Sequence, residues 1–437
     1  MDNRVLQLLR IPETRQKITL TLGIMLVYRF GFQVPLPGMD PAYLSQQAAG
    51  MTGSVFGVMN AFSGAGIGQT AIFGLGIMPY ISASIIFSML SKVSPAIEAV
   101  AKEGASGQKK INQWTRLTTI PIALVQAIFI YTGVFIRHPE MLVPGESAGF
   151  GLFLRVVLGL TAGAVFVMWL GELITEYGIG NGASLIIMAG IIAQMPGSIA
   201  RMSSGDDFYG QMVFLIFLWI VTVVAIVYIT KGARRVPIQY ARLTRGRRVY
   251  GGQRHYLPLK VNMAGVMPII FASILFVIPG VIFTALGFDS LQSLFNDRRG
   301  FTYIVSFSGL IFAFCFFWNR LMFNPEEIAN NLREHGSFIP GIRPGARTAE
   351  YLDHTLTRIT FAGAAFLAVI AVLPGIVTAG SGLDGNVAYF LGGTSVLIVV
   401  GVAMDVVDKL NAQLVMRNYE GFMKGGGGGG AWGKKGD

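Results

Sequence analysis

The sequence has few charged residues and a single cysteine. Only 13% of its 437 residues are Asp, Glu, Lys or Arg, and 53% are hydrophobic, whereas charged residues make up about 25% of soluble domains. This composition argues against a soluble domain and indicates a membrane protein. Because Cys315 is the only cysteine, an intrachain disulfide is excluded, and its apolar surroundings are typical of a small packing residue.

Motifs for nucleotides, metals and nucleophilic catalysis are also missing. The glycine-rich stretches GAGIG and GIGNG follow no strand, and neither GKS nor GKT occurs. No nucleophile–base set is visible, and the four histidines are scattered without the spacing of metal ligands: His138, His255, His335 and His354. We therefore expect no cofactor, no metal and no enzymatic activity, so a partner would have to supply energy.

Long apolar runs, in contrast, recur along the whole chain. A run of about 17–25 residues can cross the hydrocarbon core of a bilayer. We find ten, of which the fifth is the weakest, and they begin near Ile18, Ala71, Leu117, Leu152, Ala183, Met212, Val261, Phe301, Ile359 and Ala388. The first follows a basic N-terminus without a small-residue cleavage site, so we expect a retained anchor.

The basic residues predict the orientation of these spans. If the N-terminus lies inside, the segments on the cytoplasmic side hold 28 of the 34 Lys and Arg residues. Cytoplasmic loops of membrane proteins carry such an excess. We therefore expect both termini in the cytoplasm.

Two decapeptides indicate an internal repeat. GIMPYISASI (76–85) and GVMPIIFASI (265–274) agree at seven of ten positions and lie in the second and seventh predicted spans. Two halves of five spans each would insert with opposite orientations, as inverted repeats do. The alternative is a chance similarity between two apolar helices of biased composition.

The middles of the predicted spans contain almost no ionisable residues. Ion-coupled transport generally needs such residues deep in the membrane, so a small-solute transporter, the other common use of inverted repeats, lacks a visible proton or sodium site. Ile77, Ile81 and Ile85 instead recur on one helical face of the second span. Such a stripe suits a hydrophobic constriction and also ordinary helix packing.

Several long motifs resemble the SecY family, whose members form the membrane-embedded subunit of the bacterial protein-translocation channel. The likeness extends from RFGFQVPLPGMD to about residue 420. Its longest parts are FSGAGIGQTAIFGLGIMPYISASII, GELITEYGIGNGASLIIMAGI, GRRVYGGQRHYLPLKVNMAGVMPIIFAS, NPEEIANNLREHGSFIPGIRPGARTAEYL and LGGTSVLIVVGVAMDV.

The resemblance implies an all-α membrane protein. Its ten transmembrane helices would form two inverted, pseudo-symmetric halves of five around a central hourglass pore, which opens sideways between helices 2/3 and 7/8. We expect a cytoplasmic N-terminus (1–17), an N-terminal half (18–200), a C-terminal half (201–410) with cytoplasmic loops 231–260 and 324–357, and a cytoplasmic tail (411–437) that is glycine-rich from residue 425.

The resemblance also implies site residues. The pore constriction would be formed by five isoleucines, Ile77, Ile81, Ile187, Ile270 and Ile398, and the polar residues of the lateral gate would be Ser82, Arg116 and Asn262. A plug that seals the external funnel would comprise Phe62, Ser63, Gly64, Ala65, Gly66, Ile67, Gly68, Gln69, Thr70, Ala71, Ile72 and Phe73. By composition alone this glycine-rich stretch is equally a plain external loop.

The basic cytoplasmic loops predict a docking surface. Residues 234–260 contain two strand-like runs around a basic turn with glycine, which indicates a projecting hairpin. Its arginines would attract phosphates or acidic surfaces: Arg242, Arg245, Arg247, Arg248 and Arg254. A further arginine, Arg343, lies between Gly341 and Pro344. Orientation charge alone is the alternative explanation, and the resemblance favours docking to the ribosome and to the motor ATPase SecA.

Together these observations predict a gated protein-conducting channel that passes unfolded polypeptides and inserts membrane proteins laterally. The alternative is an ion-coupled small-solute secondary transporter. The resemblance implies as partners the small subunits SecE and SecG, SecA, the ribosome, signal sequences and translocating polypeptides, and anionic lipids. We expect the bacterial inner membrane, although a plastid relative would have a similar sequence.

Overall fold

The computed structural model describes residues 12–39, 71–136, 142–144, 149–202, 208–240, 243–245, 248–250, 254–261, 265–273, 275–276, 300–379 and 393–425. Most of this part of the chain is helical. In chain order its helices are α2 (Pro12–Gly31), α5 (Met78–Val93), α6 (Pro95–Lys102), α7 (Ala105–Ile130), α8 (Phe150–Tyr177), α9 (Gly182–Met202), α10 (Phe208–Lys231), α13 (Phe301–Met322), α14 (Pro325–Glu334), α15 (Ala346–Ala379) and α17 (Gly393–Gly425). A π-helical turn, η1 (Tyr131–Phe135), continues α7, and residues 267–273 and 275–276 are also helical.

Each of the ten predicted apolar runs overlaps one of these helical stretches. Within the described residues, four helices are long and apolar enough to cross a membrane: Phe150–Tyr177, Tyr209–Lys231, Phe301–Glu334 and Ala346–Leu373. The pair α5 and α6 adds a fifth if it counts as one span bent by 97°. A count of ten spans fits the fold and stays a prediction.

The second predicted run becomes helical later than its first residue, Ala71. Residues 72–77 form turns, and α5 starts at Met78 with Pro79 in its first turn. The physical reason is Gly76, whose φ of 55° is incompatible with a right-handed helix. The helix ends at Val93, and the next residue, Ser94, is extended (ψ 116°) because it precedes Pro95.

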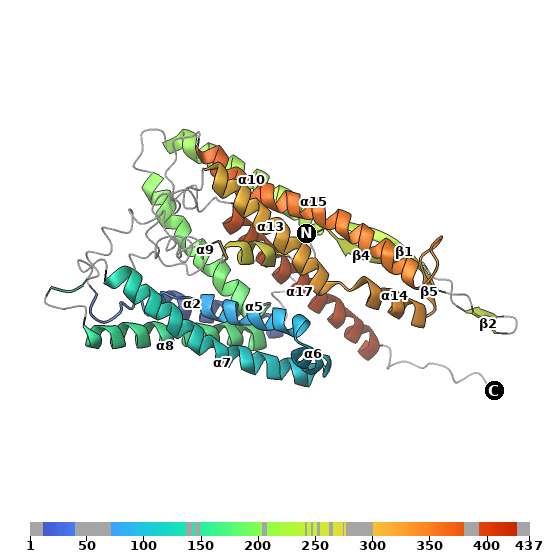
Figure 1. Ribbon diagram of the computed structural model, residues 1–437, viewed down its shortest axis with the longest axis horizontal. Helices are drawn as coiled ribbons and strands as arrows, with labels where there is room; N and C mark the ends of the chain where they lie inside the picture. The colour runs from blue at the N-terminus through green and yellow to red at the C-terminus, as the bar shows by residue number, and fades with distance from the viewer. Residues whose placement is uncertain are drawn as a thin grey trace, which may run out of the picture.

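The helices form two groups that meet along the centre of the molecule (Figure 1). One side contains α5, α7 and α8, the other contains α10, α13 and α15, and α9 and α17 lie between them. Each side has its own buried apolar cluster. The first draws on residues between 36 and 164, and the second on residues between 226 and 400. The clusters thus fall on either side of residue 200, where the sequence predicts the division into halves.

A β-hairpin projects from one end of the second group (Figure 1). Strand β1 (Ala233–Tyr240) pairs antiparallel with β4 (Arg254–Lys260), in a register that places Val236 opposite Leu257. Val236 and Leu259 are buried against Leu352 and Leu356 of α15. The short strands β2 (Leu243–Arg245) and β3 (Arg248–Tyr250) form the tip. The predicted hairpin is confirmed.

A third strand completes the hairpin sheet and was not predicted. Strand β5 (Ser337–Phe338) pairs antiparallel with the end of β1, so the strand order is β4-β1-β5. Helix α14 leads into β5, and its N-terminus is capped by Asn324, whose side-chain oxygen accepts a hydrogen bond from the Glu326 backbone nitrogen. The two predicted cytoplasmic loops therefore form one connected structure.

Candidate functional site

The five isoleucines expected at the constriction lie in one buried cluster. Each exposes 7% or less of its surface. They come from four separate parts of the chain: Ile77 and Ile81 from the start of α5, Ile187 from α9, Ile270 from the helical stretch 267–273, and Ile398 from α17. The cluster joins α5 of the first group to α9 and α17, which lie between the groups, and to residues 267–273.

The local structure of the two decapeptides explains how Ile81 and Ile270 reach this cluster. Each decapeptide begins with a glycine of positive φ, 55° at Gly76 and 62° at Gly265, and becomes helical two residues later. Each has proline as the second helical residue, where a missing N–H costs nothing. The isoleucine five residues after each glycine is therefore presented from the first turns of a helix, and both are buried.

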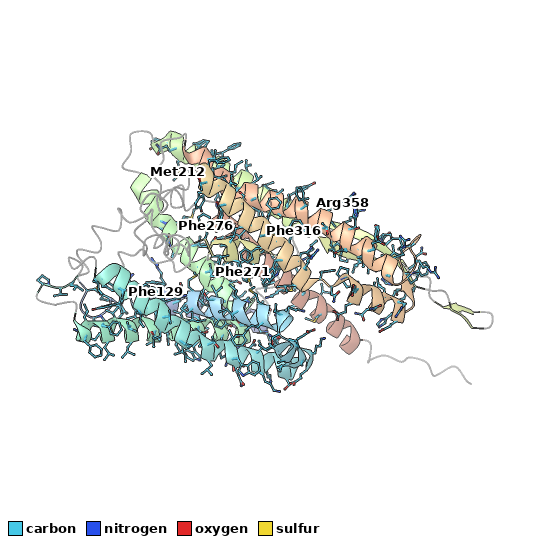
Figure 2. All side chains as sticks on the ribbon, viewed as in Figure 1. Phe129, Met212, Phe271, Phe276, Phe316 and Arg358 are labelled. Carbon is cyan, nitrogen blue, oxygen red and sulfur yellow. The ribbon has the colours of Figure 1, made fainter. Side chains whose placement is uncertain are left out.

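The residue after Ile270 attaches its helical stretch to the second group. Figure 2 labels Phe271 near the centre of the molecule, beside α13. Its ring lies 5.5 Å from that of Phe314 and 5.2 Å from that of Trp318, both on α13. The helix that carries Ile270 thus contacts the isoleucine cluster and its own group at the same time.

The last three residues of the predicted plug are seated in the core. Residues 62–70 lie outside the described residues. Ala71 is 1% exposed and forms an isolated antiparallel bridge with Pro35, and the Ile72 backbone nitrogen donates to the Val34 carbonyl at 3.0 Å. A Cβ at Gly163 of α8 would lie 2.0 Å from the Ile72 carbonyl oxygen, so only glycine admits the segment here.

Aromatic rings surround Phe73, the last of these three residues. Its ring stacks on those of Tyr28 and Phe166, at 6.3 and 5.6 Å, and meets Phe32 edge-on at 6.0 Å. Gly31 of α2 makes room for it, since a Cβ there would lie 1.8 Å from the ring. Residues 71–73 are therefore packed tightly between α2 and α8.

The structure describes two of the three residues expected at the lateral gate, Ser82 and Arg116. Ser82 is half-buried on α5, Asn262 lies outside the described residues, and Arg116 of α7 forms an ion pair with Glu172 of α8. Because α7 and α8 belong to the same group, this pair ties two neighbouring helices together. The sequence places Glu172 near an internal end and does not reveal this partner.

Gln126, in the apolar part of α7, is a polar residue that sequence reasoning missed. Its side-chain oxygen is buried and accepts no hydrogen bond from the part of the chain that the structure describes. Helix α7 packs along α5, which carries Ser82. An isolated amide in the run LVQAIF is the only sequence signal that could have drawn attention to it.

The predicted docking arginines that the structure describes lie in the hairpin and in the turn after β5. Arg245, Arg248 and Arg254 have their backbones in β2, β3 and β4, whereas Arg242 and Arg247 lie outside the described residues. Arg343 is exposed in a turn between Gly341 (φ 81°) and Gly345 (φ 102°), and its carbonyl accepts a hydrogen bond of 3.0 Å from Thr348 Oγ1.

This arrangement offers no metal site among the residues that the structure describes, where no three His, Cys, Asp or Glu side chains gather. Two groups of apolar helices that meet at one isoleucine cluster define a multi-pass helical membrane protein. The family model of SecY matches residues 71–407, well over half of the chain. The chain belongs to the SecY family.

Close relatives cover nearly the whole chain. It is 39% identical over 421 residues to the protein translocase subunit SecY of Thermotoga maritima, covering 95% of this chain and 96% of the relative. It is 41% identical over 438 residues to the SecY of Mycobacterium tuberculosis, covering 95% and 98%. Since these relatives are named as translocase subunits, the small-solute transporter alternative finds no support.

Solved structures show the same fold at low sequence identity. A protein-conducting channel matches with a TM-score of 0.61 at 17% identity, covering 92% of this chain and 93% of that one. A SecY structure, described as having a plug domain that stabilises the closed channel and maintains a membrane seal, matches with 0.62 at 17% identity over 92% of each chain. Sec61 in a canine ribosome–channel complex matches with 0.57 at 16% identity, covering 92% and 93%.

Proposed function

We propose that this chain is the channel-forming subunit of a protein translocase, which conducts unfolded polypeptides across the membrane and releases apolar segments sideways into it. The observation that carries the proposal is the convergence of Ile77, Ile81, Ile187, Ile270 and Ile398 in one buried cluster at the junction of the two helix groups. In the proposed resting state this cluster is the closed pore constriction.

The chemistry of isoleucine suits this task. Branched alkyl groups offer a hydrated ion no replacement for its water shell, so a closed ring of them blocks ions. The same groups make no directional bonds, so they can be displaced by any passing side chain. A channel that must accept many sequences needs this lack of chemical preference.

The plug would move about a fixed attachment. The clamping of residues 71–73 between α2 and α8 supports a division of the predicted plug, in which residues 62–70 leave the funnel and residues 71–73 stay seated. Glycine at positions 64, 66 and 68 suits a moving element, since it forms few stabilising contacts.

The lateral gate would open between the two helix groups. Ser82 of α5 and Gln126 of α7 supply polar atoms on the first group, and Asn262 would supply them on the second. Hydrogen bonds between membrane helices are worth about 1 kcal/mol, which a signal sequence can replace with apolar contacts. The Arg116–Glu172 pair would keep α7 and α8 together while the gate opens.

The projecting hairpin and the turn at Arg343 would form the docking surface for the ribosome and for SecA, in the cytoplasm. Phosphates of ribosomal RNA are the expected ligands of the arginines. By the family resemblance, SecE and SecG would be companion subunits, anionic lipids would contact the basic cytoplasmic side, and the bacterial inner membrane would hold the protein with both termini inside. The chain itself would catalyse no reaction.

Ion conductance of the purified complex in planar bilayers tests this proposal. The intact protein should conduct little. A variant lacking residues 62–70 should conduct several-fold more, because the plug no longer covers the constriction. Residues 71–73 are kept in this variant so that the packing of the core is not disturbed. The same deletion should still translocate a secretory substrate with SecA and ATP. If neither protein conducts ions and the substrate is not translocated, the channel function is overturned.

A further inference from the structure

A small polar cavity lies where the hairpin returns to the membrane helices. Its volume is about 20 Å³, and its walls come from three elements that are distant in sequence: the end of β4 with the residue after it, α13 and α15. The lining includes Lys260, Val261, Cys315, Asn319, Thr360 and Gly363.

One wall of this cavity carries an unpaired acceptor. The Asn319 side-chain nitrogen donates to Thr360 Oγ1, which in turn donates to the Leu356 carbonyl at 2.7 Å. The Asn319 side-chain oxygen is buried, and none of the residues that the structure describes donates a hydrogen bond to it. Buried polar atoms in native proteins nearly always have a partner, either protein or ordered water.

The size of the cavity indicates that the partner of the Asn319 side-chain oxygen is a water molecule. A cavity needs roughly 10–15 Å³ of accessible volume to hold one water molecule, and the water needs two or more polar neighbours. Thr360 Oγ1 can be the second polar neighbour of the water, because a hydroxyl oxygen has two lone pairs and only one accepts a bond from Asn319. The accessible volume of about 20 Å³ is that needed by one water molecule.

The backbone next to the cavity is closely fitted. The Val261 nitrogen donates to the Gly232 carbonyl at 2.9 Å, and a Cβ at Gly363 would lie 2.6 Å from the Val261 carbonyl oxygen. Leu259, two residues earlier, is fully buried. Val261, directly after β4, is therefore held closely against α15 beside the cavity.

We propose that this cavity binds one water molecule, which donates to the Asn319 side-chain oxygen and to Thr360 Oγ1 and holds the end of β4 in place against α13 and α15. The water completes the hydrogen bonding of the Asn319–Thr360 pair. In the translocase proposed above, this junction connects the docking hairpin to the helix that carries Ile270, but the water site itself does not depend on that function.

A density map of the purified complex that resolves ordered water tests the site directly. One peak is expected within hydrogen-bonding distance of both Asn319 Oδ1 and Thr360 Oγ1. An empty cavity, or a cavity filled by the Lys260 ammonium group, would overturn the proposal. Neither readout involves translocation, so failure of the channel function would not be mistaken for failure of the site.

Hydrogen exchange of the β4 amides supplies the second measurement. Asn319→Leu removes the acceptor at similar volume, and exchange of the backbone amides at residues 257 and 259–261 should rise several-fold. The matched control is Asn330→Leu at an exposed position of α14, which should leave that exchange unchanged. If N319L exchanges like the wild type, the water does not hold the junction.

Discussion

Gly76 and Gly265 stand at the same point of two matching decapeptides and share a left-handed backbone, with φ of 55° and 62°. In both places the turn is followed by a helix that starts two residues later and presents a buried isoleucine. This correspondence makes chance similarity a poor explanation of the sequence repeat, because the two segments share backbone conformation as well as residues.

Gly265→Ala tests the need for the left-handed turn. No atom lies within 4 Å of a Cβ placed there, so only the backbone conformation opposes the substitution. We expect a loss of about 1–2 kcal/mol of stability, the cost of this conformation for an L-residue, measured as a lower thermal midpoint of the purified complex. Gly309→Ala, at an exposed position within α13, should instead raise the stability by about 0.5–1 kcal/mol. Equal behaviour of the two variants would contradict the prediction.

The isoleucine cluster can be tested with two residues of one helix. Ile187 of α9 is 3% exposed within the cluster, whereas Ile192 of the same helix is 45% exposed. Ile187→Ser should raise the resting ion conductance in planar bilayers several-fold, because a hydroxyl lets water enter the constriction. Ile192→Ser is the control and should not raise it. A leak of the same size from both variants would argue for general destabilisation.

The packing of residues 71–73 against α8 should not tolerate an added methyl group on that helix. Gly163→Ala would place a Cβ 2.0 Å from the Ile72 carbonyl oxygen, and backbone cannot move aside as a flexible side chain can. We expect a loss of about 1–3 kcal/mol in thermal stability, as for an overpacked core, together with a higher resting conductance. Gly151→Ala, on the same helix with open space around it, is the control. Unchanged stability and conductance in G163A would show that the segment is not clamped.

The ion pair between Arg116 and Glu172 should couple α7 to α8 weakly. Because the Arg116 side chain is 48% exposed, solvent screens the pair, and a double-mutant cycle with Arg116→Gln and Glu172→Gln should give about 0.2–1 kcal/mol. Thermal unfolding of the four proteins measures it. A coupling indistinguishable from zero would mean that the two helices are held by apolar packing alone.

Arg343 should contribute to ribosome binding through phosphate contact. Arg343→Ala should weaken binding of purified ribosomes to the complex several-fold and lower the slope of log affinity against log salt by about 1. Arg347→Ala is the matched control, since that exposed side chain lies 3.7 Å from Glu350 and is partly neutralised. An equal loss in both variants would indicate a general effect of charge and not a specific contact.

Local patterns predicted local structure well. The two strand-like runs around a basic turn in residues 234–260 predicted the β1–β4 hairpin. Strand β5 escaped prediction because Ser337–Phe338 is too short to have a periodic pattern, and it exists only because β1 offers it a partner. The second apolar run begins near Ala71, but its helix begins only at Met78, because Gly76 has a backbone conformation that a helix does not admit.

Contacts between distant residues required the structure. Glu172 is 56 residues from Arg116, and no periodicity links the two. The side-chain oxygens of Gln126 and Asn319, which have no partner among the described residues, were equally hidden, because burial is a property of the packed helices and not of a sequence window.

The sequence by itself determined the apolar runs, the excess of basic residues in particular segments, and the glycines and prolines that begin and end helices. These follow from side-chain hydropathy and from backbone conformations allowed to each residue. Only the tertiary structure decided which helix faces meet, that Gly31 and Gly163 make room for residues 71–73, and that five isoleucines from Ile77 to Ile398 share one cluster. The physical reason is that packing depends on shape across elements that are far apart along the chain.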